Sequence, residues 1–297
     1  MPEHVLSGDS IAINRRYLDS LLVESRIVGA EHPETETILF GHRFSTPITT
    51  GALSHLESGM DTFAEGARRA DAACFIGMGS CEELKKVLGT GAKVIKIIKP
   101  YADPDEIFQR LECAEKEGAI AVGMDVEHSV NVSDDRDSLV AGYQMKLPTV
   151  HELKAYIRAT RLPFVIKGGL SVHDALACVD LGCAGMILSH HNGLMRWAVP
   201  PAMIIQEVRR AVGKQLTLIV DGGIADGFDA FKALALGADA VSVGRPLMNP
   251  LKEKGAQGVE ETIRQFTDEL KAMMVRTGTR DMAHMDASVI HPGGHAW

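Results

Sequence analysis

Eight short apolar segments recur along the chain, and this repetition limits the possible fold more than any other feature. Each segment is rich in β-branched residues, ends in Gly, Asp, Ser or Lys, and is followed by a helix-like stretch. Continuous apolar runs of this length are typical of parallel strands that are covered on both faces. The segments are 47–52, 73–78, 94–98, 120–125, 163–168, 185–190, 217–222 and 240–245.

The stretches between these segments carry helix start and stop signals. The stretch 172–182, for example, follows Ser171, a good N-cap, and closes with Gly182. Strands that alternate with helices form βα units around a parallel sheet. Eight such units fit a closed barrel better than an open sheet. The sequence therefore predicts an α/β fold, a (β/α)₈ TIM barrel, with 1–297 as a single domain.

One interval between the predicted strands is longer than the others. Its extra residues, 126–148, directly follow the segment 120–125. An insertion at a strand end should lie on the face where barrel enzymes carry their active sites. Long loops on that face often act as lids, although a solvated decoration is the simpler alternative. We expect 126–148 to form an active-site loop or lid.

Composition and charge limit the partners and the location of the protein. The formal net charge of −8 argues against general affinity for nucleic acid or for an anionic membrane surface. No apolar run approaches the ~20 residues of a membrane span, and the first ten residues show no signal-peptide pattern. The five cysteines include no CxxC pair, so reduced thiols in a cytoplasmic protein are the simplest interpretation.

Two glycine-rich segments follow the seventh and eighth predicted strands. They are DGGIADG at 221–227 and VGRP at 243–246. Barrel enzymes commonly bind phosphate at this place through backbone N–H groups, and glycine lets the backbone approach the anion closely. Arg245 could add a bidentate charged contact. The pair of segments predicts a phosphate site, although the glycines could instead only form tight turns.

Chemically active side chains end three other predicted strands. Lys167 closes a buried run, which is costly unless it meets a negative partner, and a structural lysine with a solvated head is the alternative. The histidines of SHHN at 189–192 are placed for general base work, and Asp125 could orient one of them. No metal site is predicted, because His190 and His191 would point to opposite sides of an extended segment.

The stretch from Lys167 to Pro246 resembles the FMN-dependent α-hydroxy-acid oxidases and dehydrogenases, the family of glycolate oxidase and lactate oxidase. The similar pieces are PFVIKGGLSVHDA, GMILSHHNG, DGGIADGFDAFKALALGADAV and GRP, and weaker similarity extends over nearly the whole chain. The resemblance implies an FMN cofactor and an enzyme that oxidises a 2-hydroxy acid or a related hydroxylated small molecule. It also implies a homo-oligomer, since family members are often tetramers.

The resemblance assigns roles position by position. His191 matches the active-site base, Asp125 the carboxylate that hydrogen-bonds it, and Lys167 the cation that stabilises the reduced flavin, whose N5 accepts the electrons. The predicted contacts to the flavin are Gly51, Ala52, Lys96, Lys167, Ser189, Asp221, Gly223, Gly244 and Arg245.

The same comparison shows gaps where the family binds the substrate carboxylate. The family arginine three residues after the base is Leu194 here, and a second arginine after the strand-four aspartate has no counterpart in VEHSVNV. A bidentate clamp contributes several charged hydrogen bonds of ~1.5–3 kcal/mol each, so its loss should change the substrate. Candidate substitute cations are Lys99, Arg136 and Arg196.

Three further family positions are changed. A family glutamine corresponds to Lys96, a tyrosine to Ile98, and an arginine of the phosphate loop to Ala225. These changes leave alternatives to a hydroxy-acid oxidoreductase open. The alternatives are a non-redox FMN-dependent isomerase, a flavin-binding protein without catalytic activity, and a flavin-free phosphate-binding barrel.

Overall fold

The centre of the protein is one eight-stranded parallel sheet. The computed structural model describes residues 8–131, 133, 136–191 and 193–293. One strand of this sheet lies in each of the eight predicted segments, with the strand at 163–168 extending one residue further to Gly169, so all eight predicted strands are confirmed. The strands are β4 (Ile48–Thr50), β5 (Cys74–Ile76), β6 (Val94–Ile98), β7 (Ala121–Asp125), β10 (Phe164–Gly169), β11 (Gly185–Leu188), β12 (Thr217–Asp221) and β13 (Ala240–Val243).

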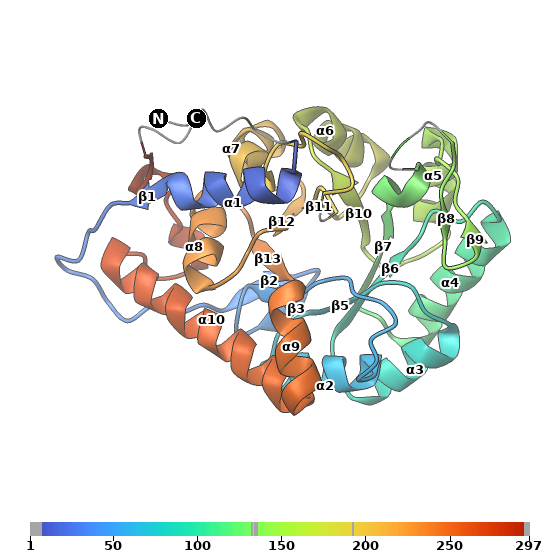
Figure 1. Cartoon of the computed structure of the whole chain (residues 1–297), viewed down its shortest axis with the longest axis horizontal. Coiled ribbons are helices and arrows are strands. Elements are labelled where there is room, and N and C mark those ends of the chain that lie inside the picture. Colours follow the sequence, from blue (N-terminus) through green and yellow to red (C-terminus); the bar gives the residue numbers. More distant parts are fainter. Residues whose placement is uncertain (1–7, 132, 134–135, 192, 294–297) are drawn as a thin grey trace.

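The sheet closes on itself. Neighbouring strands follow the order β4, β13, β12, β11, β10, β7, β6, β5, so β4 and β5 are its two edges. The N–H of Thr50 donates to the carbonyl of Ala73 at 3.1 Å, and Leu53 forms a parallel bridge with Ile76. These contacts join the two edges, and the predicted (β/α)₈ barrel is confirmed (Figure 1).

A helix follows every strand on the outside of the barrel. The predicted boundaries of α6 are confirmed: Ser171 Oγ accepts the N–H of Asp174, and Gly182 ends the helix in a left-handed conformation. None of the described helices has the length and apolar character that crossing a membrane requires. The helices are α2 (Met60–Arg69), α3 (Cys81–Gly89), α4 (Pro104–Glu117), α5 (Val150–Arg158), α6 (Val172–Leu181), α7 (Pro201–Val212), α8 (Gly227–Ala235), α9 (Arg245–Lys254) and α10 (Ala256–Thr277).

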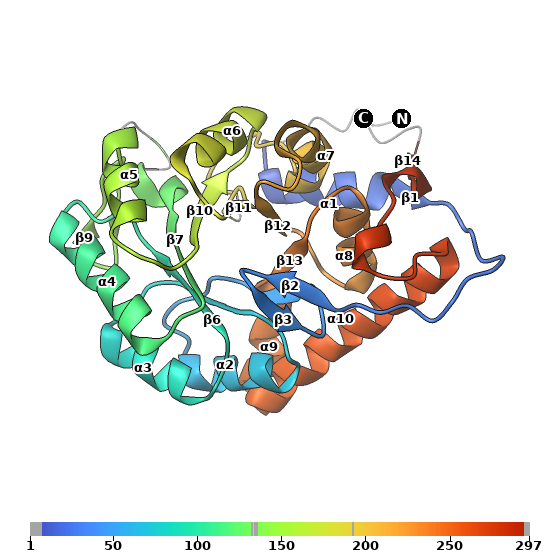
Figure 2. The ribbon, with the colours of Figure 1, turned by 180° about the vertical axis from the view of Figure 1, so that it is seen from behind.

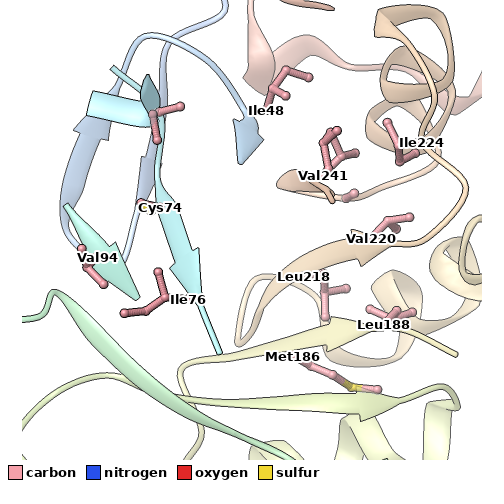
Figure 3. Close-up of a cluster of buried hydrophobic side chains, with 14 of the residues drawn as sticks. Ile48, Cys74, Ile76, Val94, Met186, Leu188, Leu218, Val220, Ile224 and Val241 are labelled. Atoms are coloured by element: carbon pink, nitrogen blue, oxygen red, sulfur yellow. The ribbon is translucent and has the colours of Figure 1, made fainter. Parts of the chain in front are cut away.

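Strand residues alternate between two apolar cores. Phe75, Ile97 and Val165 belong to the core inside the barrel. Residues such as Ile76 and Val94 belong to the larger core between the strands and the helices, part of which Figure 3 shows. Because both faces of the strands are buried, the segments are continuously apolar in the sequence. Full burial of one such side chain contributes ~1.5–3 kcal/mol.

A hairpin of the N-terminal region closes one end of the barrel. It consists of β2 (Thr37–Leu39) and β3 (His42–Phe44), and Leu39 and Phe44 pack into the interior core. Figure 2 shows this hairpin in front of the barrel strands. Functional side chains therefore gather at the other end. The remaining N- and C-terminal elements are α1 (Ser10–Ser20), β1 (Leu21–Val23), η2 (Met282–His284), η3 (Ala287–Val289) and β14 (Ile290–Pro292).

The insertion at 126–148 lies against the loop that follows β6. It contains η1 (Val126–Ser129) and a short hairpin of β8 (Leu139–Val140) and β9 (Tyr143–Gln144). The N–H of Ala102 donates to the Gln144 carbonyl, and the N–H of Lys146 donates to the Pro100 carbonyl, both at 2.9 Å. The insertion thus lies at the C-terminal end of the barrel, as expected, and its action as a lid stays a prediction. Residues 132, 134 and 135 lie outside the described part.

The cysteines correct one prediction. Cys81 at the start of α3 and Cys113 in α4 form a disulfide, whereas Cys74, Cys178 and Cys183 are free and buried. The two bonded residues are 32 positions apart with Cα atoms 6.0 Å apart. Because α3 and α4 belong to neighbouring βα units, the barrel brings these thiols together, and the expectation that all five are reduced is wrong.

Candidate functional site

A cavity of about 690 Å³ opens at the C-terminal end of the barrel. Its size is within the range of ~300–1,000 Å³ that is typical of small-molecule and cofactor sites. The wall combines the ends of β4, β12 and β13 with one face of α1. Eight of the predicted site residues line it: Gly51, Ala52, Lys167, His191, Asp221, Gly223, Gly244 and Arg245.

The wall near β13 is suited to an anion. A Cβ atom on Gly51 would lie 2.9 Å from the Cα of Gly244, and Gly223 has a φ of +77°, so glycine is required at both places. No side chain caps the N-terminus of α9, which starts at Arg245. The positive end of this helix and the Arg245 guanidinium are therefore available to a phosphate, and the phosphate site stays a prediction.

Asp125 is the centre of a buried cluster beside the cavity. It ends β7 and is paired in register with Lys167 of β10. Its Oδ2 lies 2.8 Å from Lys99 Nζ, 3.4 Å from Lys167 Nζ, 3.1 Å from His191 Nδ1 and 3.3 Å from His128 Nδ1. Four groups from four separate segments thus meet at one carboxylate oxygen.

The charges of this cluster stabilise one another. Burial alone would raise the pKa of Asp125, but the Lys167 ammonium and a hydrogen bond from His191 hold that pKa well below its usual value. Burial opposes the charge of Lys167, yet Asp125 and Asp221 raise its pKa above the ordinary value. Both partners are therefore ionised at neutral pH.

His191 has the properties of a general base. Its φ of +42° is uncommon for a residue with a side chain, and its N–H donates to Ser189 Oγ at 3.0 Å. Burial, together with the nearby Lys167 ammonium, lowers the pKa of His191 to about 4, so the imidazole is neutral at pH 7. Lys167 Nζ also lies 2.8 Å from His191 Nδ1, but Lys167 lines the cavity. Once Lys167 turns to a bound cofactor, Nδ1–H would donate to Asp125 and the ring would present Nε2 as a proton acceptor.

Two serines orient the carboxylate of Asp221. Ser189 Oγ donates to Oδ2 at 2.8 Å, and Ser242 Oγ donates to Oδ1 at 2.9 Å. Asp221 Oδ2 lies 3.8 Å from Lys167 Nζ. The predicted site residue Ser189 therefore holds both the Asp221 carboxylate and the His191 backbone in place. The predicted Asp221 lines the cavity.

Lys96 corrects a prediction. The alternation along β6 places Ile97 in the barrel interior and turns Lys96 toward the helices, where its Nζ donates to the Gly77 carbonyl at 2.5 Å. Lys96 lines a separate cavity of about 220 Å³ that Arg110 also lines. The predicted flavin contact of Lys96 is therefore wrong, and Lys99 is the lysine that reaches Asp125 from this strand.

The candidate substitute cations occupy different places. Lys99 is buried, with 7% of its surface exposed, and contacts Asp125. Arg136 and Arg196 are exposed, and neither is among the residues that line the 690 Å³ cavity. Of the three, Lys99 is the one that the fold brings to the histidines.

The turn after β11 has a structural histidine as well as His191. His190 is buried, and its Nδ1 accepts the N–H of Gly193 at 3.1 Å. Leu194 is partly buried and donates its N–H to the His190 carbonyl at 3.2 Å. Asn192 lies outside the described residues. The position of the lost family arginine therefore carries a side chain without a polar group.

Three residues at the site were not predicted. His128 and Glu127 follow Asp125 directly in the chain, and burial raises the pKa of Glu127 to about 8, so this acid is neutral at pH 7. Arg15 of α1 lines the cavity and binds Asp229 through two hydrogen bonds of 2.6 and 2.8 Å. Ala225, at the position of the family's phosphate-loop arginine, lines the same cavity. The position of His128 after a strand-end aspartate was a usable signal; nothing in the barrel repeat indicated Arg15.

The cluster also meets the distance requirement for a metal. Ligand atoms of Asp125, His128 and His191 lie within 4.8 Å of one another. However, Lys99 Nζ is 2.6 Å from His128 Nδ1, and Lys167 Nζ is 2.8 Å from His191 Nδ1. Two ammonium groups repel a further cation at this distance. The absence of a resident metal therefore stays our prediction.

Comparison with known proteins agrees with this geometry. The family model described as FMN-dependent dehydrogenase matches residues 132–292, more than half of the 297 residues. The chain is 36% identical over 161 residues to L-lactate oxidase of a Roseobacter species, which is 54% of this chain and 44% of that protein. It is 26% identical to glycolate oxidase of Spinacia oleracea over 95% of this chain and 87% of that protein.

A solved structure is similar over almost the whole chain. Mandelate oxidase with (S)-2-phenylpropionate has a TM-score of 0.85 and 26% identity, covering 96% of this chain and 90% of that one. The cavity volume, its glycines and Arg245 fit a flavin mononucleotide, the cofactor of the matched family. The chain belongs to the FMN-dependent dehydrogenase family.

Proposed function

We propose that this protein is an FMN-dependent oxidoreductase that oxidises a 2-hydroxy acid, or a related hydroxylated small molecule, with His191 as the base. The observation that carries the proposal is the Asp125–His191–Lys167 cluster. Lys167 and His191 line the same cavity as Arg245, which lies at its anion-binding end. The similar proteins named as lactate, glycolate and mandelate oxidases support the substrate class.

Each of these residues would have a separate role in binding the cofactor or in moving a proton. Arg245, Gly223 and Gly244 would hold the phosphate of FMN, which supplies a two-electron acceptor when bound. Oxidation of a hydroxyl to a carbonyl removes two electrons and two protons from the substrate. His191 would take the hydroxyl proton at Nε2, and the ionised Asp125 at 3.1 Å would stabilise the resulting imidazolium.

The proposed function is tested by mixing the FMN-loaded protein with a panel of 2-hydroxy acids under anaerobic conditions. We expect at least one acid to abolish the absorbance of the oxidised flavin. A protein that keeps its FMN but is reduced by none of these acids would instead be the non-redox isomerase or the non-catalytic binder. A protein that neither purifies with FMN nor takes it up would be the flavin-free barrel.

Replacement of Arg245 by alanine is expected to weaken FMN binding by about 10- to 150-fold. This range corresponds to the ~1.5–3 kcal/mol of one charged hydrogen bond. The measurement is the dissociation constant of FMN by fluorescence titration of the flavin-free protein. Arg43, which is exposed on the hairpin at the other end of the barrel, provides the matched control Arg43→Ala. Unchanged affinity in Arg245→Ala would show that the phosphate lies elsewhere.

Lactate and glycolate are expected to be poor substrates. Leu194 offers no donor to a carboxylate, and the second arginine of the family is missing, so the family's way of binding a small acid is lost. Steady-state assays with an artificial electron acceptor measure this. A kcat/KM of ~10⁴ M⁻¹s⁻¹ or more for either acid would contradict the expectation. Lys99→Ala and Arg196→Ala would then be the first variants to compare.

Location and assembly are further proposals. A homo-oligomer, as in the tetramers of the family, is favoured by the exposed apolar side chains of Leu22, Ile27 and Val28. A cytoplasmic location is favoured by three free cysteines, while the Cys81–Cys113 disulfide argues against it. Light scattering of the purified protein tests the oligomeric state. Counting the free thiols of protein taken from intact cells tests the location.

A further inference from the structure

His128 and His191 share the same carboxylate oxygen. Their Nδ1 atoms lie 3.3 and 3.1 Å from Asp125 Oδ2, and their rings meet edge to face with centroids 3.8 Å apart. Because Nδ1 and Nε2 lie on opposite sides of an imidazole, each Nε2 points away from Asp125. The side chains are 20% and 25% exposed; His191 lines the cavity, and the His128 ring lies directly beside it.

Lys99 fixes the proton position of His128. Its Nζ lies 2.6 Å from His128 Nδ1, closer than Asp125 Oδ2 at 3.3 Å. An ammonium only donates hydrogen bonds, so Nδ1 accepts and the ring proton resides on Nε2. Lys99 is not among the residues that line the cavity, so Asp125 and His128 remain its partners when the cavity is filled. His128 therefore carries its N–H donor on the side of the ring that faces away from Asp125.

We propose that this N–H of His128, with the Lys99 ammonium behind it, binds the carboxylate of the substrate in place of the missing arginines. The inference rests on the proposed function and names the group that recognises the acid. In a 2-hydroxy acid the carboxylate is attached to the carbon that bears the hydroxyl. The two binding groups must then be neighbours, as the rings of His191 and His128 are.

The charges of the cluster agree with this role. Asp125 and Asp221 balance Lys167 and Lys99, and Glu127 adds no charge because burial raises its pKa to about 8. A substrate carboxylate would thus meet a donor backed by an ammonium and no unpaired anion. A hydrogen bond to a carboxylate of this kind contributes ~1.5–3 kcal/mol, less than a bidentate arginine. We therefore expect weaker binding of small acids than a clamp would give.

The test compares His128→Leu, which removes the donor, with His128→Gln, which keeps an N–H. Oxalate serves as a probe that binds without turnover, and its dissociation constant is read from the flavin absorbance of the FMN-loaded protein. We expect a 10- to 150-fold weaker affinity in His128→Leu and a smaller loss in His128→Gln. His173→Leu, whose side chain is 92% exposed on α6, is the matched control and should bind oxalate like the wild type.

Comparing the effect on KM with the effect on kcat distinguishes a role in binding the carboxylate from a structural role. For the best acid of the panel, KM should rise in His128→Leu by about the factor seen for oxalate, whereas kcat changes less. The methyl ester of the same acid lacks the carboxylate, so its KM should not rise. If His128→Leu does not fold, Lys99→Met decides, because loss of the ammonium releases the fixed proton and should weaken oxalate binding.

Unchanged oxalate affinity in His128→Leu, or in Lys99→Met, overturns the inference. When the wild type is at the same time reduced by a 2-hydroxy acid, the proposed function still stands. A wild type that neither binds oxalate nor is reduced by any acid of the panel overturns both. An equal rise of KM for the acid and its methyl ester also overturns the inference, since His128 would then act on the shape of the site.

Discussion

Replacement of His191 by alanine is expected to lower the rate of flavin reduction by ~10²–10⁴-fold while FMN stays bound. The imidazole is neutral at pH 7 because burial lowers its pKa to about 4, and alanine leaves no group to take the hydroxyl proton. Arg245 and the glycines that would hold the phosphate are not altered. Anaerobic stopped-flow measurement of flavin absorbance gives the rate, and the FMN content of the purified variant gives the occupancy.

His190→Ala is the matched control for this variant. His190 is buried and accepts the Gly193 N–H through Nδ1, so it holds the turn after β11 and does not line the cavity. We expect His190→Ala to lose stability but to keep most of its activity. An inactive His190→Ala beside an active His191→Ala would mean that the two roles are exchanged.

The barrel could be predicted because its strands are buried on both faces. Runs such as 94–98 and 217–222 are short, apolar and followed by helix signals, and each contains a strand. Parallel strands end at the same face, so residues that close different runs were expected to meet there. Asp125, the last residue of one run, and Lys167, near the end of another, are indeed paired in register.

The same property explains the error at Lys96. A strand that alternates between apolar and polar residues shows which side chains point inward, and a one-residue shift exchanges the two faces. In the run VIKII every residue is buried, so the run itself carries no such information. The structure shows that Ile97 points into the barrel and that Lys96 points outward. Only the strand pairing could decide between the two.

Other parts of the site depend on contacts between distant segments. Arg15 of α1 reaches Asp229, and Cys81 reaches Cys113, through the packing of separate helices. No local pattern encodes such a contact. His128 is different, because its place three residues after Asp125 was visible in the sequence.

Replacement of Asp125 by asparagine is expected to destabilise the flavin-free protein by ~3–5 kcal/mol. The variant leaves two buried ammonium groups, Lys99 at 2.8 Å and Lys167 at 3.4 Å, without the carboxylate that they share. Removal of one partner from a buried ion pair costs more than the pair contributes, because the remaining charge stays out of water. Equilibrium unfolding in guanidinium chloride at neutral pH measures the change in the free energy of unfolding.

The double variant Asp125→Asn/Lys99→Met separates loss of charge pairing from general damage. If unpaired ammonium groups cause the instability, removing one of them should recover part of the loss, so the two substitutions are not additive.

The pH dependence of stability gives a second check. The pKa of Asp125 is lower in the folded protein than the ~3.9 of the unfolded chain, so its stabilisation is complete above about pH 4 and is lost as the pH falls toward the folded value. The stability difference between wild type and Asp125→Asn should therefore shrink below about pH 4. A difference that stays constant down to the acid transition, together with no recovery in the double variant, would show that the charge of Asp125 does not hold this end of the barrel together.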